Sequence, residues 1–245
     1  MHTAKDVHRE LELVAEKNRI FDLQRFFQTA PGQYAEGDRF IGVRVPNQRA
    51  VAKRFRTLPL AEIATLLKSP VHEHRLTALF ILVYQFRSSN DPAVKKKIVT
   101  LYQANRKHIN NWDLIDSSAP YILGEYFYDH DRAPIYALVQ SKSQWDRRIA
   151  VMTTFYWLRQ KGDFADTFKM AEQLLTDPEP LIHKAVGWML REIGKLDYNA
   201  ERLWLDKHAA TMPRTMLRYA IEKMSPSVRQ HYLAIEHTGE KTKTI

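Results

Sequence analysis

The chain has 245 residues, of which 44% are hydrophobic, so it can bury a sizeable core as one large domain or two small ones. Its 37 Lys and Arg outnumber its 28 Asp and Glu, and the formal charge of +9 favours an anionic partner such as nucleic acid or an acidic membrane surface. Cysteine is absent, which excludes disulfides and thiolate metal sites. The first residues, MHTAKDVHRE, lack the apolar run of a signal peptide, and no stretch approaches the roughly 18 apolar residues of a membrane span. We therefore expect a soluble intracellular protein.

The apolar pattern predicts an all-α protein. Apolar residues recur every three or four positions along most of the chain, which has only 8 glycines. An N-terminal amphipathic stretch that includes residues 11–23 is interrupted at Pro31–Gly32. A loop then leads to Val45–Pro46, and Pro46 is suited to the first turn of the next helix.

Five segments of similar style follow, each with a polar or basic opening and then an apolar helix. They are residues 72–86, 111–127, 145–160, 181–195 and 213–224. Companion helices are predicted between them at 91–108, 133–142 and 163–176. One charged residue in each segment is taken as the equivalent position of the repeat: Arg75, Asp116, Arg148, Lys184 and Arg218. Consecutive positions are about 32 to 41 residues apart, the length of a helix–turn–helix repeat.

The sequence therefore predicts an α-solenoid of helical repeats over residues 1–236, followed by a short polar tail at 237–245. One helix of each pair lines the concave surface of such a stack, so the polar openings would converge on one basic groove that tracks a polyanion. The alternative is a set of solvated charges scattered around the outside. The candidate groove residues are Arg44, Arg54, Arg75, Arg147, Arg148, Lys184, Arg191, Arg214 and Arg218.

The segment NWDLIDSSAP combines a tryptophan with two acids. Trp112 and Asp116 are four residues apart and share a helix face, whereas Asp113 lies about 100° away from Trp112. Asp113 can act as a cap or interact with the helix dipole from the first turn. Asp116 falls deeper in the apolar run, where an unpaired carboxylate is costly, so it requires a cationic partner or a functional role.

Related residues occur in the next two recurring segments. Arg148 follows Trp145–Asp146–Arg147 at the opening of one segment, and Trp188 lies near the start of the segment after it. A tryptophan in a helix is usually a core residue, so each position is weak evidence alone. Four such residues, however, fall at related positions in three successive repeats, and this makes them candidates for one site. They are Trp112, Asp116, Arg148 and Trp188.

Four motifs together resemble the DNA alkylation repair glycosylases of the AlkD type, which are built from HEAT-like helical repeats. The motifs are GVRVPNQRAVAKRF, NWDLIDSSAP, RRIAVMTTFYWLRQ and KAVGWMLREIGK. The resemblance covers about residues 10 to 225 and implies that Trp112, Asp116, Arg148 and Trp188 are the functional residues, with the choice between Arg147 and Arg148 left open. It implies double-stranded DNA that contains alkylated bases as the partner, and a location in the cytoplasm, at the nucleoid when DNA is bound.

The family resemblance implies hydrolysis of the N-glycosidic bond of N3- and N7-alkylated purines, such as 3-methyladenine and 7-methylguanine, in base excision repair. These bases carry positive charge and leave without a general acid, so Asp116 would stabilise the oxocarbenium-like sugar or orient the attacking water. Trp112 and Trp188 would cradle the cationic nucleotide, and Arg148 would hold a flanking phosphate. Neutral lesions such as uracil should be poor substrates, because the Trp112–Asp116 face contributes neither a histidine nor a second acid.

No metal, cofactor or nucleotide-loop signature is recognised in the sequence. His72 and His74 are two residues apart and lack the four-residue helical spacing of a zinc-binding pair. We expect a monomer without a cofactor and without membrane contact. Two alternatives remain: a non-catalytic HEAT-repeat protein that binds damaged or branched DNA, and a protein–protein scaffold with an acidic partner. Neither alternative needs Asp116.

Overall fold

The structure is a computed structural model that describes residues 2–238, and this part of the chain is helical. β-type pairing among residues 2–238 is limited to an isolated bridge between Arg39 and Val71. This confirms the predicted all-α class. No helix in the same range has both the length and the apolar composition needed to cross a membrane. Most of the predicted polar tail, residues 239–245, lies outside the described residues.

The chain divides into two compact units, Met1–Tyr126 and Phe127–Ile245. The helices of the first unit are α1 (Ala4–Leu13), α2 (Ile20–Phe27), α3 (Val45–Arg54), α4 (Leu60–Leu67), α5 (His72–Ser88), α6 (Pro92–Ala104) and α7 (Trp112–Asp116). The division falls within α8 (Glu125–Tyr128). The second unit contains α9 (Ala133–Val139), α10 (Gln144–Lys161), α11 (Ala165–Gln173), α12 (Pro180–Gly194), α13 (Tyr198–His208), α14 (Arg214–Ala220) and α15 (Pro226–Ala234).

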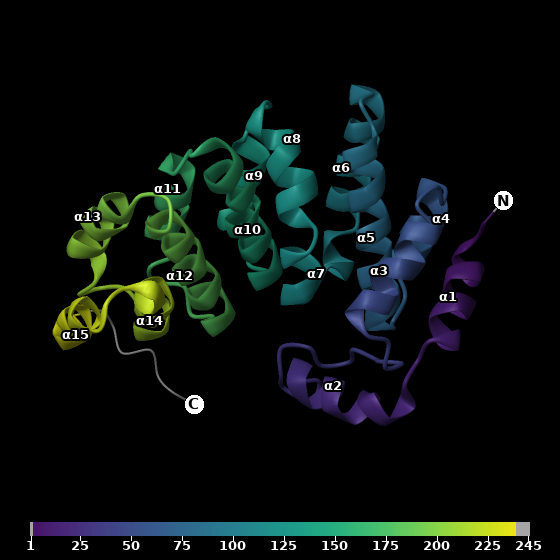
Figure 1. The fold of residues 1–245 in the computed structure, drawn as a ribbon, viewed down its shortest axis with the longest axis horizontal. Coiled ribbons are helices and arrows are strands. Elements are labelled where there is room, and N and C mark those ends of the chain that lie inside the picture. Colours follow the sequence, from purple (N-terminus) through teal and green to yellow (C-terminus); the bar gives the residue numbers. More distant parts are fainter. Residues whose placement is uncertain (1, 239–245) are drawn as a thin grey trace. The chain divides into compact units, whose positions relative to one another are not determined.

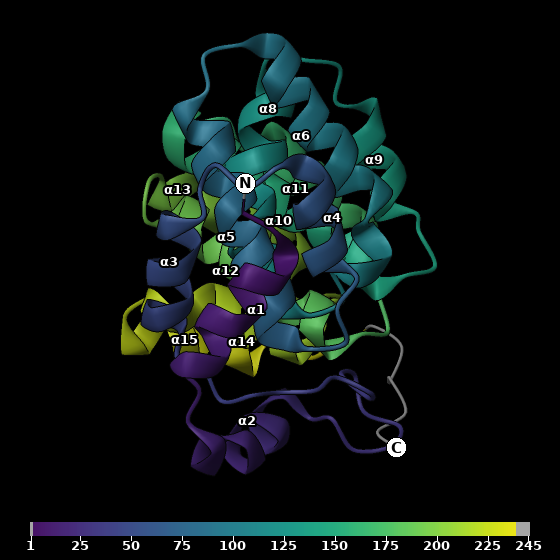
Figure 2. The same ribbon diagram turned by 90° about the vertical axis from the view of Figure 1, so that its right-hand side faces the viewer.

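Within each unit, the recurring helices pack in series and the companion helices pack beside them. In the second unit α12 packs on both α10 and α14, while α9 and α11 contact α10 and α13 contacts α12 (Figure 1). In the first unit α5 is the central helix: it packs on α3, α4, α6 and α7, and every residue from His72 to Val83 is buried. Figure 2 shows α2 and the loop after it at one edge of this unit, below α3 and α5.

The helix pairs confirm the predicted repeat pattern, with two differences in local structure. The segment predicted as one helix over 111–127 is interrupted after α7, and continues as a π-helix at Pro120–Gly124 and then as α8. Pro120 has no backbone N–H to continue the helical hydrogen bonds, and the Ser118 hydroxyl donates to the carbonyl of Leu114 at 2.6 Å. The N-terminal stretch forms two helices, α1 and α2, separated by a turn in which the N–H of Glu16 bonds the carbonyl of Gly42 at 3.2 Å.

Three of the recurring helices begin at the same kind of turn, which we call the turn clamp. A polar side chain accepts the backbone N–H two residues later at 2.9 to 3.2 Å, and this residue is Ser69 before α5, Ser141 before α10 and Asp177 before α12. The carbonyl of the same residue accepts a side-chain N–H from six residues later. The donors are Arg75, Arg147 and His183.

The turn clamp corrects the register that the sequence indicated. The spacing of the basic residues equates Arg75 with Arg148 and Lys184, but its structural equivalents are Arg147 and His183, one residue earlier in each segment. Arg148 and Lys184 remain equivalent to each other. The error arises because two adjacent arginines occupy the opening of α10, and only the hydrogen bonds of the turn distinguish them.

Candidate active site

Helix α7 is short but firmly anchored at its start. Asn111 is its N-cap and accepts the N–H of Trp112 at 2.8 Å, and Asp113 accepts the N–H of Leu114 at 2.9 Å. Leu114 is buried in the core of the first unit. Trp112 and Asp116 are half-buried and stand four residues apart, so both are presented on one face of a fixed helical turn.

The Trp112 ring belongs to an aromatic cluster. It stacks on Phe27 with ring centroids 5.4 Å apart and meets the edge of Phe26 at 5.9 Å. Its indole N–H donates to the Tyr34 hydroxyl at 3.3 Å. Phe26 is 63% exposed, so the cluster reaches the surface. The tryptophan is therefore held by α2 and the following loop and still presents part of its ring to solvent.

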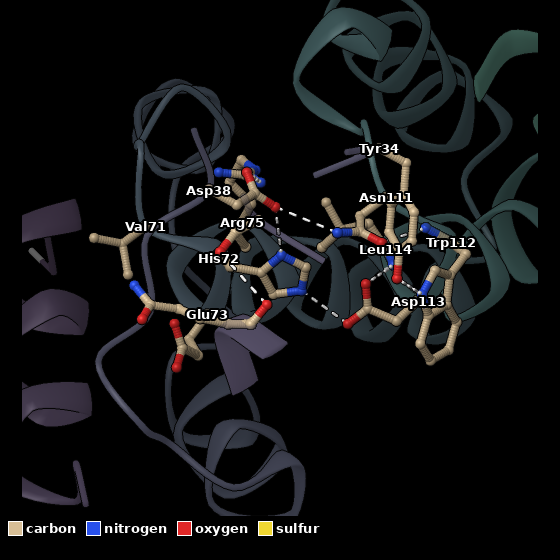
Figure 3. Close-up of polar contacts among 12 residues, drawn as sticks. Tyr34, Asp38, Val71, His72, Glu73, Arg75, Asn111, Trp112, Asp113 and Leu114 are labelled. Carbon is tan, nitrogen blue, oxygen red and sulfur yellow. Dashed lines mark hydrogen bonds and ion pairs between the residues drawn. The ribbon is translucent and has the colours of Figure 1, made fainter. Parts of the chain in front are cut away.

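A buried histidine connects α7 to the rest of the first unit. His72 is hydrogen-bonded through Nδ1 to Asp38 at 3.0 Å and through Nε2 to Asp113 at 2.8 Å (Figure 3). The second oxygen of Asp38 accepts from Arg75 at 2.6 Å, and Asn111 donates to Asp38 at 3.3 Å. The loop after α2, the start of α5 and the start of α7 are thus joined by one polar network.

The network favours a charged imidazole. Burial alone would lower the pKa of His72, but the Asp113 carboxylate and the hydrogen bonds to Asp113 and Asp38 raise that pKa to about 9. Burial also favours the neutral form of Asp38, yet the hydrogen bond from His72 and the charge of Arg75 hold its pKa below the ordinary value. At neutral pH the imidazolium of His72 therefore lies between the carboxylates of Asp38 and Asp113, and Asp38 also pairs with the guanidinium of Arg75.

Glu73 fixes the loop that contains the GVRVP motif. One of its carboxylate oxygens accepts the backbone N–H groups of Ile41, Gly42 and Val43 at 2.8 to 3.2 Å. Gly42 has a φ of +89°, and a Cβ there would lie 2.1 Å from the carbonyl oxygen of Glu16. Only glycine therefore fits at this position, which explains the first residue of the motif.

Trp188 lies in the second unit on α12. Its ring is half-buried, contacts Phe155 at 5.7 Å, and donates its indole N–H to Glu192 at 3.1 Å. The preceding Gly187 is buried where α12 meets α14. The Lys-Ala-x-Gly-Trp run therefore combines a helix contact made by glycine with a tryptophan that remains partly exposed.

The two candidate arginines have different surroundings. The Arg147 guanidinium pairs with the Asp177 carboxylate through two nitrogens and also donates to the carbonyls of Ser141 and Lys142 at 2.9 and 3.0 Å. Its donors are therefore used by the turn clamp. Arg148 is buried and donates to the carbonyl of Leu181, in the first turn of α12, at 2.6 Å. Phosphate binding by Arg148 remains a prediction.

The predicted basic groove residues fall into several environments. Arg75 is 4% exposed and ion-paired with Asp38, so its charge is neutralised inside the first unit, and DNA contact by this residue stays a prediction. The exposed Arg44 and Arg54 pair with Glu16 and Glu10.

In the second unit, Arg191 pairs with Glu222, and Arg214 donates to the carbonyls of Leu233 and Ile235. Lys184 and Arg218 are exposed. For these residues DNA contact stays a prediction.

Trp112 and Asp116 belong to the first compact unit, and Arg148 and Trp188 to the second. The structure brings together Trp112 and Asp116, one turn apart on α7, and it places Arg148 at the carbonyl of Leu181 in α12, the helix that carries Trp188. Each pair is thus fixed within its own unit.

The sequence reasoning missed the role of His72, Asp38 and Asn111. His72 and His74 are both buried, and His74 is hydrogen-bonded to Ser69 at 2.9 Å. A polar VHEHR run at the start of an otherwise apolar helix was the available signal, because buried charges require partners. Within residues 2–238, no group of three or more His, Cys, Asp or Glu side chains is arranged to hold a metal ion.

Comparisons with known proteins now give the site a context. A protein family described as DNA alkylation repair enzyme matches residues 7–224. A solved structure titled predicted DNA alkylation repair enzyme from Enterococcus faecalis has a TM-score of 0.66 at 15% identity, covering 86% of this chain and 97% of that chain.

The crystal structure of smu.31 from Streptococcus mutans UA159 has a TM-score of 0.49 at 18% identity, covering 97% and 99% of the two chains. No curated protein gives a significant match. The Enterococcus likeness shows a shared all-α repeat fold, and the family match spans most of the chain.

Proposed function

Because this chain belongs to the DNA alkylation repair enzyme family, we propose that it is a DNA glycosylase that releases N3- and N7-alkylated purines from duplex DNA. Membership of the family implies a DNA substrate. The observation that carries the glycosylase proposal is the pairing of Trp112 with Asp116 on one face of α7, a turn anchored by Asn111 and by the hydrogen bond that His72 donates to Asp113. A preorganised carboxylate beside an aromatic face suits a reaction in which positive charge develops on a sugar.

In the proposed reaction the bond between C1′ and the purine nitrogen breaks, and its electrons neutralise the cationic base. The departing base then needs no proton. The sugar becomes oxocarbenium-like, Asp116 stabilises this charge, and a water oriented by the same carboxylate adds to C1′. The water loses its proton to solvent, which leaves an abasic site and a neutral alkylated base. Trp112 covers one side of the reacting nucleotide and excludes bulk water.

The second unit contributes the other two residues of the proposal. Trp188 provides a second aromatic face, with its ring held by Phe155 and its indole N–H by Glu192. Arg148 is preferred over Arg147 because four hydrogen bonds already commit the Arg147 guanidinium to Asp177 and to its own turn. In this proposal Arg148 holds a phosphate next to the lesion, a contact that positions DNA without reading its sequence.

The test is single-turnover release of 7-methylguanine and 3-methyladenine from methylated duplex DNA. We expect the wild type to release both bases, and Asp116→Asn to bind the same DNA but release them about 100-fold more slowly, since it keeps the side-chain size and loses the charge. Asp129→Asn changes an exposed aspartate of the second unit in the same way and is the matched control. It should release both bases at the wild-type rate.

Two results would contradict the proposal. If Asp116→Asn released base as fast as Asp129→Asn, the carboxylate would have no role in the reaction. If neither the wild type nor the variants released base while all bound DNA with a steep salt dependence, the α7 face would be a binding surface and the protein a non-catalytic DNA-binding member of the family.

A further inference from the structure

A hollow in the first unit is lined almost entirely by polar and charged side chains. It lies where the turn before α5 and the turn before α7 meet the loop after α2, and its volume is about 240 Å³. This is below the roughly 300 Å³ at which pockets for drug-sized ligands begin, so the hollow suits a small polar group. We call it the Lys68–Lys107 hollow, after two lysines in its lining.

The two lysines are placed by turns and not by ion pairs. Lys68 is the C-cap of α4, where its backbone N–H donates to the carbonyl of Thr65 at 3.2 Å. Lys107 lies in the 3₁₀ turn Arg106–His108. Both side chains are exposed, and neither pairs with a carboxylate among residues 2–238. Two ammonium groups at one hollow are therefore available to an anion.

The field at the hollow is positive, as the half-buried His108 in the same lining indicates. Burial lowers the pKa of His108, and the charges of Lys107, Arg75 and Lys68 lower it further. No carboxylate opposes this effect. The imidazole of His108 is therefore neutral at neutral pH, and the charge around it is that of the neighbouring cations.

The two carboxylates in the lining already have hydrogen-bond donors of their own. Asp38 is bonded to His72 at 3.0 Å and to Arg75 at 2.6 Å, within the buried network. Glu36 accepts the backbone N–H of Gly32 at 2.9 Å. The charge that remains uncommitted at the hollow is therefore that of the lysines, which favours an anion over a cation.

We propose that the Lys68–Lys107 hollow binds a phosphate group of the DNA backbone through the two ammonium groups. Phosphate is a compact anion with several acceptor oxygens, and lysine binds it as a point charge. Lys107 lies five residues before Trp112, in the turn that leads to α7, so this contact positions DNA next to the candidate active site. The proposal requires DNA as the partner, which family membership implies, and does not require the glycosylase reaction.

Both lysines lie outside the set predicted for the basic groove, because each precedes a recurring helix instead of opening it. Free inorganic phosphate has the same chemistry as a backbone phosphate and is the other source of such a group. The two experiments below separate a hollow that contacts DNA from one that binds only the free ion.

The first experiment measures the affinity of the full chain for an unmodified labelled duplex by fluorescence anisotropy across a salt series. Lys68→Gln and Lys107→Gln should each reduce the magnitude of the slope of log affinity against log salt by about 1. Lys96→Gln removes the same charge from an exposed position on α6, outside the hollow, and should leave the slope unchanged. The proposal is overturned if both hollow variants keep the wild-type slope, or if Lys96→Gln reduces it equally.

The second experiment follows the imidazole of His108 by NMR in histidine-labelled protein, with the signal assigned from His108→Gln. Adding the duplex to the wild type should raise the pKa of His108, because a bound phosphate opposes the charge of the lysines. The double variant Lys68→Gln/Lys107→Gln should show no rise on adding the duplex. A rise with inorganic phosphate alone, and none with the duplex, would contradict the proposal and assign the hollow to the free ion.

Both experiments use unmodified DNA and involve no reaction, whereas base release is assayed on methylated duplex. If the slopes fall and His108 responds in a protein that releases no base, the phosphate site stands and the proposed glycosylase fails. If base is released while the slopes and His108 are unaffected, the phosphate site alone is wrong.

Discussion

His72 is the residue on which the geometry of the first unit's candidate site depends. It is 1% exposed and bridges Asp38 and Asp113, which lie 75 residues apart in the chain. A neutral side chain at this position would leave two buried carboxylates without a shared cation, which is costly in a protein interior. The stability of the folded protein therefore depends on whether the imidazole of His72 is protonated.

The first residue-scale prediction concerns pH. Because the folded-state pKa of His72 is raised from 6.5 to about 9, its contribution is fully present below about pH 6.5 and is lost as pH rises through 9. Urea unfolding of the wild type should show a loss of about 3 kcal/mol of stability from this group between pH 6.5 and 9.5. His72→Gln should be less stable at pH 6.5 and should lack this loss. Equal pH slopes in the two proteins would refute the assignment.

Glu201 should show a pH dependence in the second unit. Its carboxyl is buried against Gly194, where a Cβ would lie 1.7 Å from Oε2, and burial raises its pKa to about 8 although Arg191 opposes the shift. A raised carboxyl pKa gives stability that is complete below the unfolded value of 4.5 and is lost as pH rises through 8. Glu201→Gln should therefore be more stable than wild type at pH 8, by on the order of 3 kcal/mol, and similar at pH 4.5. Urea unfolding of the variant and the wild type at these two pH values gives the difference, and an unchanged difference would count against a buried neutral acid.

At the scale of elements, the contact between α12 and α14 depends on Gly187. A Cβ at this position would lie 2.4 Å from the backbone oxygen of Met216 and 2.6 Å from the Cβ of Tyr219. Neither atom is the end of a flexible side chain, so the two helices must separate to admit a methyl group. This explains why the residue before Trp188 is a glycine in the middle of a helix, where glycine is otherwise unfavourable.

Gly187→Ala should lower the free energy of unfolding by about 3 kcal/mol, as expected for overpacking against backbone, although alanine is the better helix former. Denaturant unfolding measures the change. Lys184→Ala lies on the exposed side of the same helix and should change the stability by less than about 0.5 kcal/mol. A stable Gly187→Ala variant would mean that α12 and α14 can move apart without cost.

The sequence predicted the long apolar helices well, but not the local interruption of a helix or the partners of buried charges. Apolar periodicity predicted α5, α10 and α12 within one or two residues, because these helices are long and bury an apolar face. It did not predict the interruption after α7, which depends on Pro120 and the hydroxyl of Ser118. Partners for buried charges were also beyond reach, since Asp38, His72 and Asp113 come from three separate segments and are joined only by tertiary folding.

At the scale of the whole molecule, the formal charge of +9 counts basic side chains that are not available to contact DNA, because some of them are held in buried ion pairs. Arg75 and Arg147 are held by Asp38 and Asp177 inside their units, whereas Lys184 and Arg218 are exposed. Each phosphate contact contributes about −0.9 to the slope of log affinity against log salt for duplex DNA. The slope should therefore follow the exposed cations and not the total charge.

Lys184→Gln and Arg218→Gln should each reduce the magnitude of this slope by about 1, measured by fluorescence anisotropy with a labelled duplex across a salt series. Arg147→Lys should leave the slope unchanged and lower the stability, since a lysine cannot reproduce the two bonds to Asp177. A reduced slope for Arg147→Lys, or unchanged slopes for both glutamine variants, would contradict this division between structural and DNA-facing cations.

The turn clamp has a consequence for comparing the repeats with one another. An offset of one residue in an alignment turns a helix by about 100° about its axis, which is enough to exchange a core-facing position for a solvent-facing one. Aligning on the basic residue of each helix introduces this offset between Arg75 and Arg148. Aligning on Ser69, Ser141 and Asp177 removes it, so that inward and outward positions in each repeat correspond.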